Sequence, residues 1–276
     1  MFSLNCKGKL VLLDKPLVMG IINVNSESFY AGSRVSSADD IVKKAGKMIK
    51  EGADILDIGG QSTRPGSKRI SVDEELSHVL PAIKLIRENF EDIILSIDTY
   101  HARVAESAVS AGVSMVNDIS AGNMDEAMID TVAALEVPYI AMHMKGVPET
   151  MQQQAIYDDV TREVLDFFIK KIDQCRKAGI KDIIADPGFG FGKKIIHNFT
   201  LLKNLSLFTL LDVPILAGLS RKSTIYKTLD VPVEEALNGS TVLNTIALQM
   251  GANILRVHDV KEAKEIITLS GAYGNA

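Results

Sequence analysis

Residues 36–59, SSADDIVKKAGKMIKEGADILDIG, decide the fold of this chain. Ser37 is a predicted helix N-cap, because Asp40 follows it in a pattern similar to a capping box. Apolar side chains then share one face at helical spacing: Ile41, Ala45, Met48 and Ile49. Gly52 stands where helices commonly end in a left-handed residue, and an apolar run begins directly after it. The stretch therefore predicts a helix, a tight turn and a strand in immediate succession.

The same unit recurs along the chain. Helix–glycine–strand junctions appear again at Gly112, Gly179 and Gly251. Eight β-rich runs are spread over the sequence, at residues 18–24, 53–59, 92–98, 114–119, 138–144, 182–188, 214–220 and 253–259. Most of these runs are continuously apolar, as parallel strands are when helices cover both faces of the sheet.

Eight strands that alternate with helices predict an α/β fold, a single-domain (β/α)8 TIM barrel over residues 1–276. A doubly wound open sheet is the alternative. No linker or compositional shift divides the chain. Residues 1–17 are expected to be an N-terminal extension, a short hairpin that closes one end of the barrel.

Composition and charge argue against several classes of protein. A net charge of −5 disfavours binding to nucleic acid or to an anionic membrane surface. Cys6 and Cys175 lie in no metal or disulfide pattern, which favours a reducing compartment. Lys7, Asp14 and Pro16 interrupt the N-terminal segment, so we expect neither a signal peptide nor a membrane span. The expectation is a soluble protein of the cytoplasm.

Each predicted strand ends in residues that can carry chemistry. In chain order these are Asn23, residues 62–64, Asp98, Asn117 with Asp118, His143, Asp186, residues 220–223, and Arg256 with His258. In a (β/α)8 barrel these strand ends converge on the face where active sites are built. We therefore expect one site at the carboxyl ends of the strands.

Some of these residues also fit purely structural roles. Asp98 and Asp186 could cap the helices that follow, and Asn117 could be a hydrogen-bonded amide in the core. Arg221 and Lys222 lie at a predicted helix start, where positive charge opposes the helix dipole, and this favours a functional role.

The histidines are predicted to have different roles. His258 alternates with Arg256 on one predicted strand, so both side chains would point the same way and could form an anion site. His143 is expected to be structural or a wall residue. Three others are expected at the surface: His78, His101 and His197.

Motif spacings exclude three classes of enzyme. Residues 188–194, GFGFGKK, resemble a phosphate-binding loop but lack the Walker spacing. The chain also has no H-E-x-x-H and no G-x-S-x-G motif. It is therefore not expected to be a P-loop enzyme, a zincin or a serine hydrolase.

The polar residues fall into two chemical sets. Arg64, Arg256 and His258 can surround a phosphate group, because guanidinium forks match phosphate oxygens, and Asn23 offers a neutral oxygen to Mg²⁺. The second set mixes donors and acceptors, as a flat heterocycle with amino, amide and carbonyl groups requires: Asp98, Asn117, Asp186 and Lys222. Apolar walls could come from Met142, Phe189 and Phe191.

Nine stretches of the chain together resemble the dihydropteroate synthase family over nearly the whole length. They are VMGIINV, GADILDIGGQSTRPGS, SIDT, VNDIS, MHMKGVPETMQ, DPGFGFGK, HNFTLLKNL, AGLSRKS and RVHDV, in the family's order and spacing. The resemblance implies a transferase that joins a dihydropterin bearing a CH₂–diphosphate arm to 4-aminobenzoate. The products would be diphosphate and the folate precursor 7,8-dihydropteroate. It also implies Mg²⁺, a homodimer, and sulfonamides as competitors of 4-aminobenzoate.

The resemblance also implies a role for each matching residue. The pterin would be held by Asp98, Asn117, Met142, Asp186, Phe191 and Lys222. The diphosphate would be bound by Asn23, Arg64, Arg256 and His258, with Mg²⁺ on Asn23. The 4-aminobenzoate would be held by Phe29, Thr63, Pro65 and Ser223, with its carboxylate at the helix start after SRKS. Catalysis would rest on Asp98, Lys222, Arg256 and His258, through positioning and charge stabilisation.

The chain departs from the family pattern in two loops. Residues 23–29 read NVNSESF where the family usually reads N-V-T-P-D-S-F, and Gln61 stands where the family usually has Glu. These changes bear on closure of the first loop and on the fit of the second substrate. A pterin-binding methyltransferase domain and an inactive pterin-binding paralogue are the alternative functions.

Overall fold

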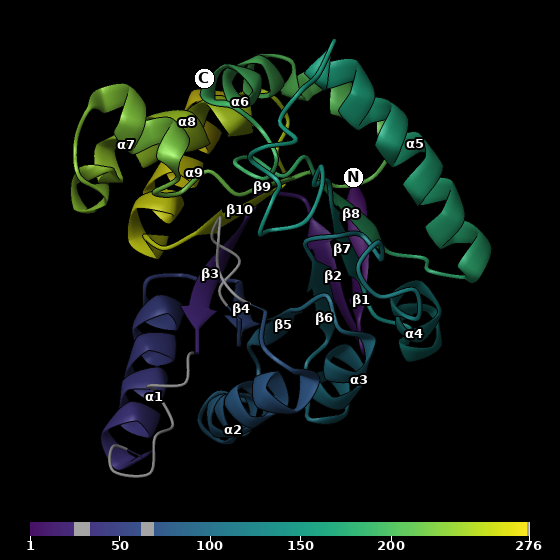
Figure 1. Ribbon diagram of the computed structural model, residues 1–276. Coiled ribbons are helices and arrows are strands. Elements are labelled where there is room, and N and C mark those ends of the chain that lie inside the picture. The colour runs from purple at the N-terminus through teal and green to yellow at the C-terminus, as the bar shows by residue number, and fades with distance from the viewer. Residues whose placement is uncertain (25–33, 62–68, 275) are drawn as a thin grey trace.

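A parallel barrel forms the centre of the computed structural model, which describes residues 1–24, 34–61, 69–274 and 276 (Figure 1). Within these ranges eight strands form one sheet: β3 (Leu17–Asn23), β4 (Ile55–Gly59), β5 (Ile94–Asp98), β6 (Met115–Asp118), β7 (Tyr139–Met142), β8 (Ile183–Asp186), β9 (Leu216–Ala217) and β10 (Ile254–Val257). Their order in the sheet is β8-β7-β6-β5-β4-β3-β10-β9, and neighbouring strands pair in parallel.

The barrel closes between β8 and β9. An isolated parallel bridge joins Ala185 to Ile215, and the Ala185 N–H donates to the Pro214 carbonyl oxygen at 2.9 Å. This closure confirms the predicted (β/α)8 barrel, and the doubly wound open sheet is wrong. The short β9 limits the pairing at this seam.

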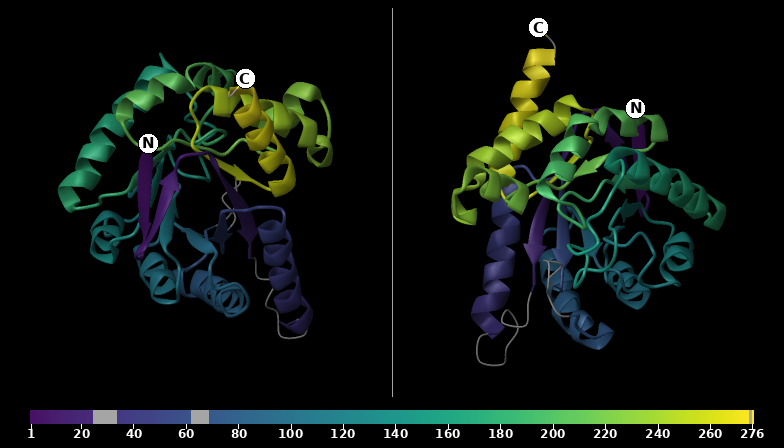
Figure 2. Two further views of the ribbon diagram at one scale, coloured as in Figure 1. Left: turned by 180° about the vertical axis from the view of Figure 1, so that it is seen from behind. Right: turned by 45° about the horizontal axis from the view of Figure 1, so that its top comes forward.

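Helices surround the barrel (Figure 2). They are α1 (Arg34–Lys50), α2 (Val72–Asn89), α3 (Ala102–Ser110), α4 (Met128–Leu135), α5 (Val160–Ala178), α6 (Ile195–Lys203), α7 (Ser223–Leu229), α8 (Leu237–Gln249) and α9 (Val260–Gly274), with 3₁₀ turns at Leu205–Leu211 and Val233–Glu235. Helix α1 begins at Arg34, so the prediction that Ser37 is its N-cap is wrong. Within the described ranges, no helix has the length and apolar character needed to cross a bilayer.

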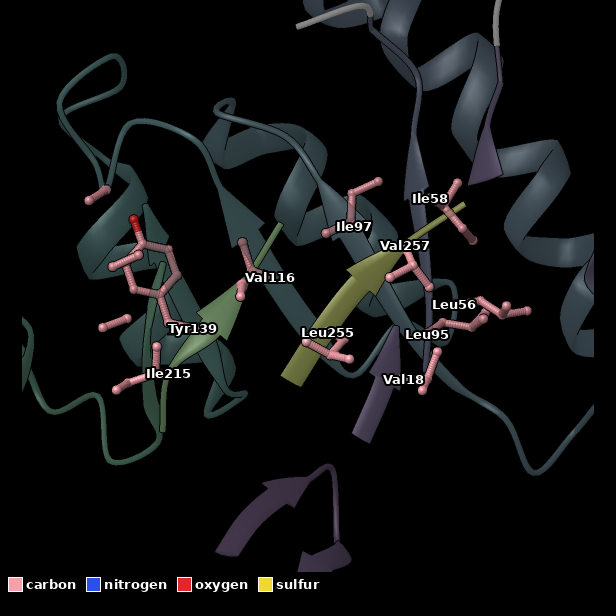
Figure 3. Close-up of a cluster of buried hydrophobic side chains, with 14 of the residues drawn as sticks. Val18, Leu56, Ile58, Leu95, Ile97, Val116, Tyr139, Ile215, Leu255 and Val257 are labelled. Carbon is pink, nitrogen blue, oxygen red and sulfur yellow. The ribbon is translucent and has the colours of Figure 1, made fainter. Parts of the chain in front are cut away.

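Alternation along the strands sends side chains to two separate cores. Outward side chains of the strands pack against the helices, among them Val18, Leu56, Leu95, Val116 and Leu255 (Figure 3). Inward side chains form a second cluster inside the barrel: Met19, Ile55, Ile94, Met115, Ile140, Ile184, Leu216 and Ile254. Because each strand contributes to both clusters, its apolar run is nearly continuous in sequence.

The expected N-terminal hairpin is present and closes the amino-terminal end of the barrel. Strands β1 (Phe2–Cys6) and β2 (Lys9–Leu13) pair antiparallel. Leu4, Cys6 and Leu13 join the inner cluster. The other face of the hairpin carries Leu10 and Leu12, which are 65% and 50% exposed.

The hairpin should contribute to stability through its buried face. Leu4 is 1% exposed, so Leu4→Ala leaves a cavity and should lower the free energy of unfolding by about 2–5 kcal/mol. Leu12→Ala, on the solvent face of the same hairpin, should change it by no more than about 0.5 kcal/mol. Urea unfolding measures both, and equal losses would contradict the closing role of the hairpin.

Candidate active site

The inward side chains change from apolar to polar toward the carboxyl ends of the strands. Two residues beyond the inner apolar cluster, the same faces carry Asp57 after Ile55, Asn117 after Met115, Asp186 after Ile184 and Arg256 after Ile254. Asp98 ends β5 and is paired in register with Asn117 of β6. The barrel therefore gathers these polar groups at one mouth, where the sequence predicted a site.

Arg256 connects the predicted residues to one another. Its Nε donates to Asp57 Oδ2 at 2.6 Å, and its Nη2 donates to Asp98 Oδ2 at 2.5 Å. Asn117 Nδ2 donates to the same Asp57 oxygen at 2.9 Å. Thus Asp57, which the sequence analysis missed, joins residues from β6 and β10. Asp57 is completely buried and lies within the apolar run of residues 53–59, which is why it was not predicted as a site residue. Its position two residues after the inward-facing Ile55 is the pattern that indicates its place in the mouth.

Burial sets the charge state of the mouth. It raises the pKa of Asp98, against the opposing charge of Arg256. Burial also raises the pKa of Asp186, and the charge of Lys222 and the Gly188 N–H oppose it. For Arg256, burial lowers the pKa, but Asp57 and Asp98 outweigh this effect and raise it. The guanidinium therefore stays charged at the centre of the mouth.

Lys222 reaches the mouth from the loop between β9 and α7. It is the N-cap of α7, and its Nζ donates to the Phe189 carbonyl oxygen. The same Nζ lies 4.7 Å from the centroid of the Phe191 ring. Burial lowers the pKa of Lys222 to about 8, with Asp186 opposing the shift. A cation, an aromatic face and a buried carboxylate thus occur within one small region.

A cleft of about 570 Å³ opens over this region. The predicted site residues that line it are Asn23, Asp98, Phe191, Lys222, Arg256 and His258. Asn117, Met142 and Asp186 are buried beneath it rather than on its lining. Met142 packs with Tyr100, Ile119, Met144 and Met151, and Phe191 lies against this cluster. Ser223 is the first residue of α7, next to Lys222.

His258 lies in the cleft, but not on the strand that was predicted to carry it. Strand β10 ends at Val257, so His258 directly follows the strand, and it lines the same cleft as Arg256. The His258 backbone N–H donates to Ser220 Oγ at 3.2 Å, and this hydroxyl lies 3.2 Å from His258 Nδ1. Desolvation and the charge of Arg256 lower the pKa of His258, so the imidazole is neutral at pH 7.

The alternative of helix capping by Asp98 and Asp186 is wrong. The N-cap of α3 is His101 and that of α6 is Lys194. Asp186 Oδ1 instead accepts from the Gly188 N–H at 2.7 Å in the loop after β8. Asn117 is a buried, hydrogen-bonded amide, as the structural alternative predicted. Its hydrogen bond to Asp57 also places it in the mouth of the barrel.

Arg221 also lines the cleft, where it forms a bidentate ion pair with Asp259 at 2.8 and 2.9 Å and donates to the carbonyls of Val233 and Glu234. One further expectation is wrong. His78 is buried, not at the surface, and its Nδ1 lies 3.2 Å from the Gly60 carbonyl oxygen. The structural role expected for His143 fits its burial and its contact with Lys193, another residue that the sequence analysis missed.

Four predicted site residues lie outside the described residues: Phe29, Thr63, Arg64 and Pro65. The departures from the family pattern at Asn25, Ser26 and Glu27 also fall there. Gln61 is described, and its Nε2 donates to the Tyr100 hydroxyl at 2.6 Å.

Asn23 is the predicted metal ligand, at the end of β3 and on the cleft lining. A Cβ at position 59 would be in van der Waals contact with both Asn23 Oδ1 and Asp98 Oδ2, at 3.7 Å from each. No group of three or more His, Cys, Asp or Glu in the described part of the chain could hold a metal ion. Asn23 Oδ1 is a neutral oxygen of the kind that a hard cation such as Mg²⁺ takes alongside waters or ligand oxygens.

The role of Asp57 in holding the mouth together is testable by its removal. Asp57→Ala should lower the free energy of unfolding by about 3–5 kcal/mol, because it leaves the partly buried Arg256 and the buried Asn117 without their shared acceptor. Glu149→Ala removes an ion pair to Arg69 in which the side chains are 35% and 44% exposed, and should cost no more than about 1 kcal/mol. Chemical denaturation compares the two, and a loss for Asp57→Ala as small as for Glu149→Ala would refute this role.

Comparisons with known proteins agree with this geometry. The family model described as "Pterin binding enzyme" matches residues 19–258. Dihydropteroate synthase of Escherichia coli (strain K12) is 43% identical over 265 residues, covering 95% of this chain and 93% of that protein. The solved structure of Xanthomonas albilineans dihydropteroate synthase with 4-aminobenzoic acid is 39% identical, with a TM-score of 0.91 over 99% of this chain and 98% of that one.

A second solved structure, the Xanthomonas albilineans enzyme in complex with 7,8-dihydropteroate, is 36% identical. It has a TM-score of 0.87 and covers 99% of both chains. The family match spans the barrel from β3 to the residue after β10, and the sequence relative aligns over nearly the whole length. This chain belongs to the dihydropteroate synthase family of pterin-binding enzymes.

Proposed function

We propose that this protein is a dihydropteroate synthase. It would join (7,8-dihydropterin-6-yl)methyl diphosphate to 4-aminobenzoate, forming 7,8-dihydropteroate and diphosphate. The observation that carries the proposal is the set of acceptors and donors gathered at the barrel mouth, of which Asp98, Asn117 and Asp186 are buried and Lys222 and Arg256 are partly buried. The relatives of the same name, and the structural neighbours with 4-aminobenzoic acid and dihydropteroate, support it.

The pterin ring fits the mixed chemistry of the mouth. Carboxylates at Asp98 and Asp186 accept hydrogen bonds from its N–H groups, and Lys222 donates to a carbonyl or ring nitrogen. Asn117, held by Asp57, can present its amide oxygen. Phe191 and Met142 supply apolar surface beside these groups. Because the carboxylates and Asn117 are buried and hydrogen-bonded, they are oriented before the ligand arrives.

The diphosphate arm meets a mouth whose positive charge is already largely compensated. Arg256 is bound by two carboxylates through Nε and Nη2, so both N–H groups of Nη1 and the second N–H of Nη2 remain for phosphate oxygens. His258 can contribute a neutral N–H donor, and Arg64 remains a predicted partner outside the described residues. Because two carboxylates already compensate the charge of Arg256, the diphosphate needs positive charge from another source.

We propose Mg²⁺ as the source of that charge, with Asn23 as its protein ligand. The support is the position of Asn23 on the cleft lining, where its neutral side-chain oxygen lies beside Gly59. When bound, Mg²⁺ would neutralise charge on the departing diphosphate. The residues of the chain would meanwhile hold the dihydropterin so that its C–O bond to diphosphate can break, leaving a positive charge on the CH₂ group that the electron-rich ring spreads.

The amine nitrogen of 4-aminobenzoate then forms the new C–N bond, and one amine proton is released. The cleft would exclude water from the CH₂ cation and hold the amine in line. Four residues remain predicted for the 4-aminobenzoate site: Phe29, Thr63, Pro65 and Ser223. Of these, Ser223 lies within the described residues, beside the pterin donor Lys222.

The alternative of a pterin-binding methyltransferase domain would need no diphosphate site, and the relatives compared above are dihydropteroate synthases. The inactive-paralogue alternative rests on the first loop, which lies outside the described residues. A homodimer in the cytoplasm stays a prediction, and the burial of both free cysteines is compatible with a reducing compartment.

Product formation tests the proposed function. Purified protein with the dihydropterin diphosphate, 4-aminobenzoate and Mg²⁺ should yield dihydropteroate by mass spectrometry. Lys222→Ala should slow formation by about 100-fold or more, since it removes a donor at the reacting ligand. Lys227→Ala, an exposed lysine on the same helix, is the control and should be unaffected. Absence of dihydropteroate with the wild-type protein would refute the proposal.

The pH dependence of the reaction should report Lys222. Its pKa is lowered to about 8, so its proton is lost as pH rises through that value and a charged donor to the pterin disappears. We expect kcat/KM for the pterin substrate to fall above about pH 8, and Lys222→Arg, which stays charged, to lose this dependence whatever its overall activity. A wild-type profile that stays flat to pH 10 would contradict the assignment.

A further inference from the structure

Lys193 lies behind the pterin pocket with its amine turned into the protein. It is the lysine of the DPGFGFGK stretch, in the loop after β8, and its side chain is only 3% exposed. Nζ lies 2.9 Å from His143 Nδ1 and donates to the carbonyl oxygens of His143, Gly188 and Phe191 at 3.2, 3.0 and 3.1 Å. One amine therefore connects the loop after β7 with two points of the loop after β8.

The four neighbours fit an ammonium group. Lysine offers three N–H donors and no acceptor, and all four contacting atoms can accept. Such an arrangement leaves His143 neutral, with Nδ1 as the acceptor. Burial lowers the pKa of His143, and the charge of Lys193 adds to the shift, which agrees with a neutral ring. Burial and the charge of Lys222 lower the pKa of Lys193, with Asp186 opposing the shift, and carbonyl dipoles are the amine's direct neighbours where an ion pair would otherwise be expected.

The backbones of the two loops that Lys193 connects are in direct contact where the loops cross. Gly188 has φ +70°, and a Cβ there would lie 2.0 Å from the His143 carbonyl oxygen. Gly192 has φ +59°, and a Cβ there would lie 2.6 Å from the Lys145 carbonyl oxygen. Glycine is required at both positions, because the conformation is left-handed and no side chain fits. The loops touch through their backbones, and Lys193 bonds to both sides of the contact.

The residues that Lys193 holds also shape the pterin pocket. Gly188 donates its N–H to Asp186 Oδ1 at 2.7 Å, while its carbonyl accepts from Lys193. Phe191 accepts from Lys193 through its carbonyl, and its ring lies 4.7 Å from Lys222 Nζ. Lys193 therefore contacts Gly188, the hydrogen-bond partner of the predicted pterin acceptor Asp186, and Phe191, the aromatic neighbour of the pterin donor Lys222.

We propose that Lys193, with His143 as its partner, is a positioning residue for the pterin pocket. It fixes the loop that orients Asp186 and Phe191, and through Phe191 the surroundings of Lys222. It does not touch substrate itself. The inference rests on the proposed function, since it concerns how this chain holds the pterin ring.

A second buried lysine distinguishes this role from simple support of the fold. Lys171, on α5, is 7% exposed, and its Nζ donates to Asn123 Oδ1 at 3.1 Å and to Gln174 Oε1 at 2.9 Å. These partners lie outside the set that shapes the pterin pocket. Lys171→Met and Lys193→Met each replace a buried amine by an apolar chain of similar length, so both should destabilise the fold.

The experiment is calorimetric titration of each variant with a dihydropterin that lacks the diphosphate arm, alongside thermal unfolding. Lys193→Met should raise the pterin dissociation constant about tenfold or more, because small displacements of a binding group have large effects. Lys171→Met should bind as the wild type does, despite its lower melting temperature. Lys193→Gln keeps N–H donors for the buried carbonyls, should show a smaller loss, and carries the test if Lys193→Met does not fold.

Two outcomes would overturn the inference alone. One is unchanged pterin affinity in the Lys193 variants while the wild type binds. The other is an equal loss in Lys171→Met, which would mean that any loosening of the fold weakens binding. A wild-type protein that binds no pterin and forms no dihydropteroate would instead overturn the proposed function, and this inference with it.

Discussion

The site depends on one buried contact, the guanidinium of Arg256 held between the carboxylates of Asp57 and Asp98. These residues are 199 and 158 positions apart from Arg256 in sequence, and the strand order β5-β4-β3-β10 brings them within 2.6 and 2.5 Å. Removing such charges from water is costly, and the cost is offset only when each charge finds its partners. The contact therefore depends on the strand order of the barrel, because an open sheet with a different order would separate β10 from β4.

The interior of the barrel has two layers, an apolar one that fills the barrel and a polar one at its mouth that forms the site. Below the mouth, the inner apolar cluster and the N-terminal hairpin fill the barrel. Above it, the same inward faces carry Asp57, Asn117, Asp186 and Arg256. A rigid apolar layer supports a polar layer whose groups already hold one another, through the hydrogen bonds of Asp57 and the loop contacts of Lys193. The ligand then meets oriented groups instead of having to order them.

Much of this arrangement could be predicted from the sequence, because it follows from local pattern. Strand–helix alternation gave the barrel, and the polar strand ends gave Asp98, Asn117, Asp186, Lys222 and Arg256. What could not be predicted depends on partners distant in sequence. Asp57 is an acid in an apolar run, and its role appears only when Arg256 and Asn117 reach it. Arg221 pairs with Asp259, His78 is buried by the fold, and Lys193 turns inward because glycines let two loops touch.

A crystal structure of the protein with a bound dihydropterin would test the preformed site most directly. We expect the ring at the barrel mouth, with its N–H groups on Asp98 and Asp186, Lys222 as a donor, and Arg256 still bonded to Asp57. A pterin bound elsewhere on the molecule would rule out the mouth as the pterin site. A pterin in the mouth with Arg256 detached from Asp57 would contradict the preformed site, since that contact would then not be what holds it.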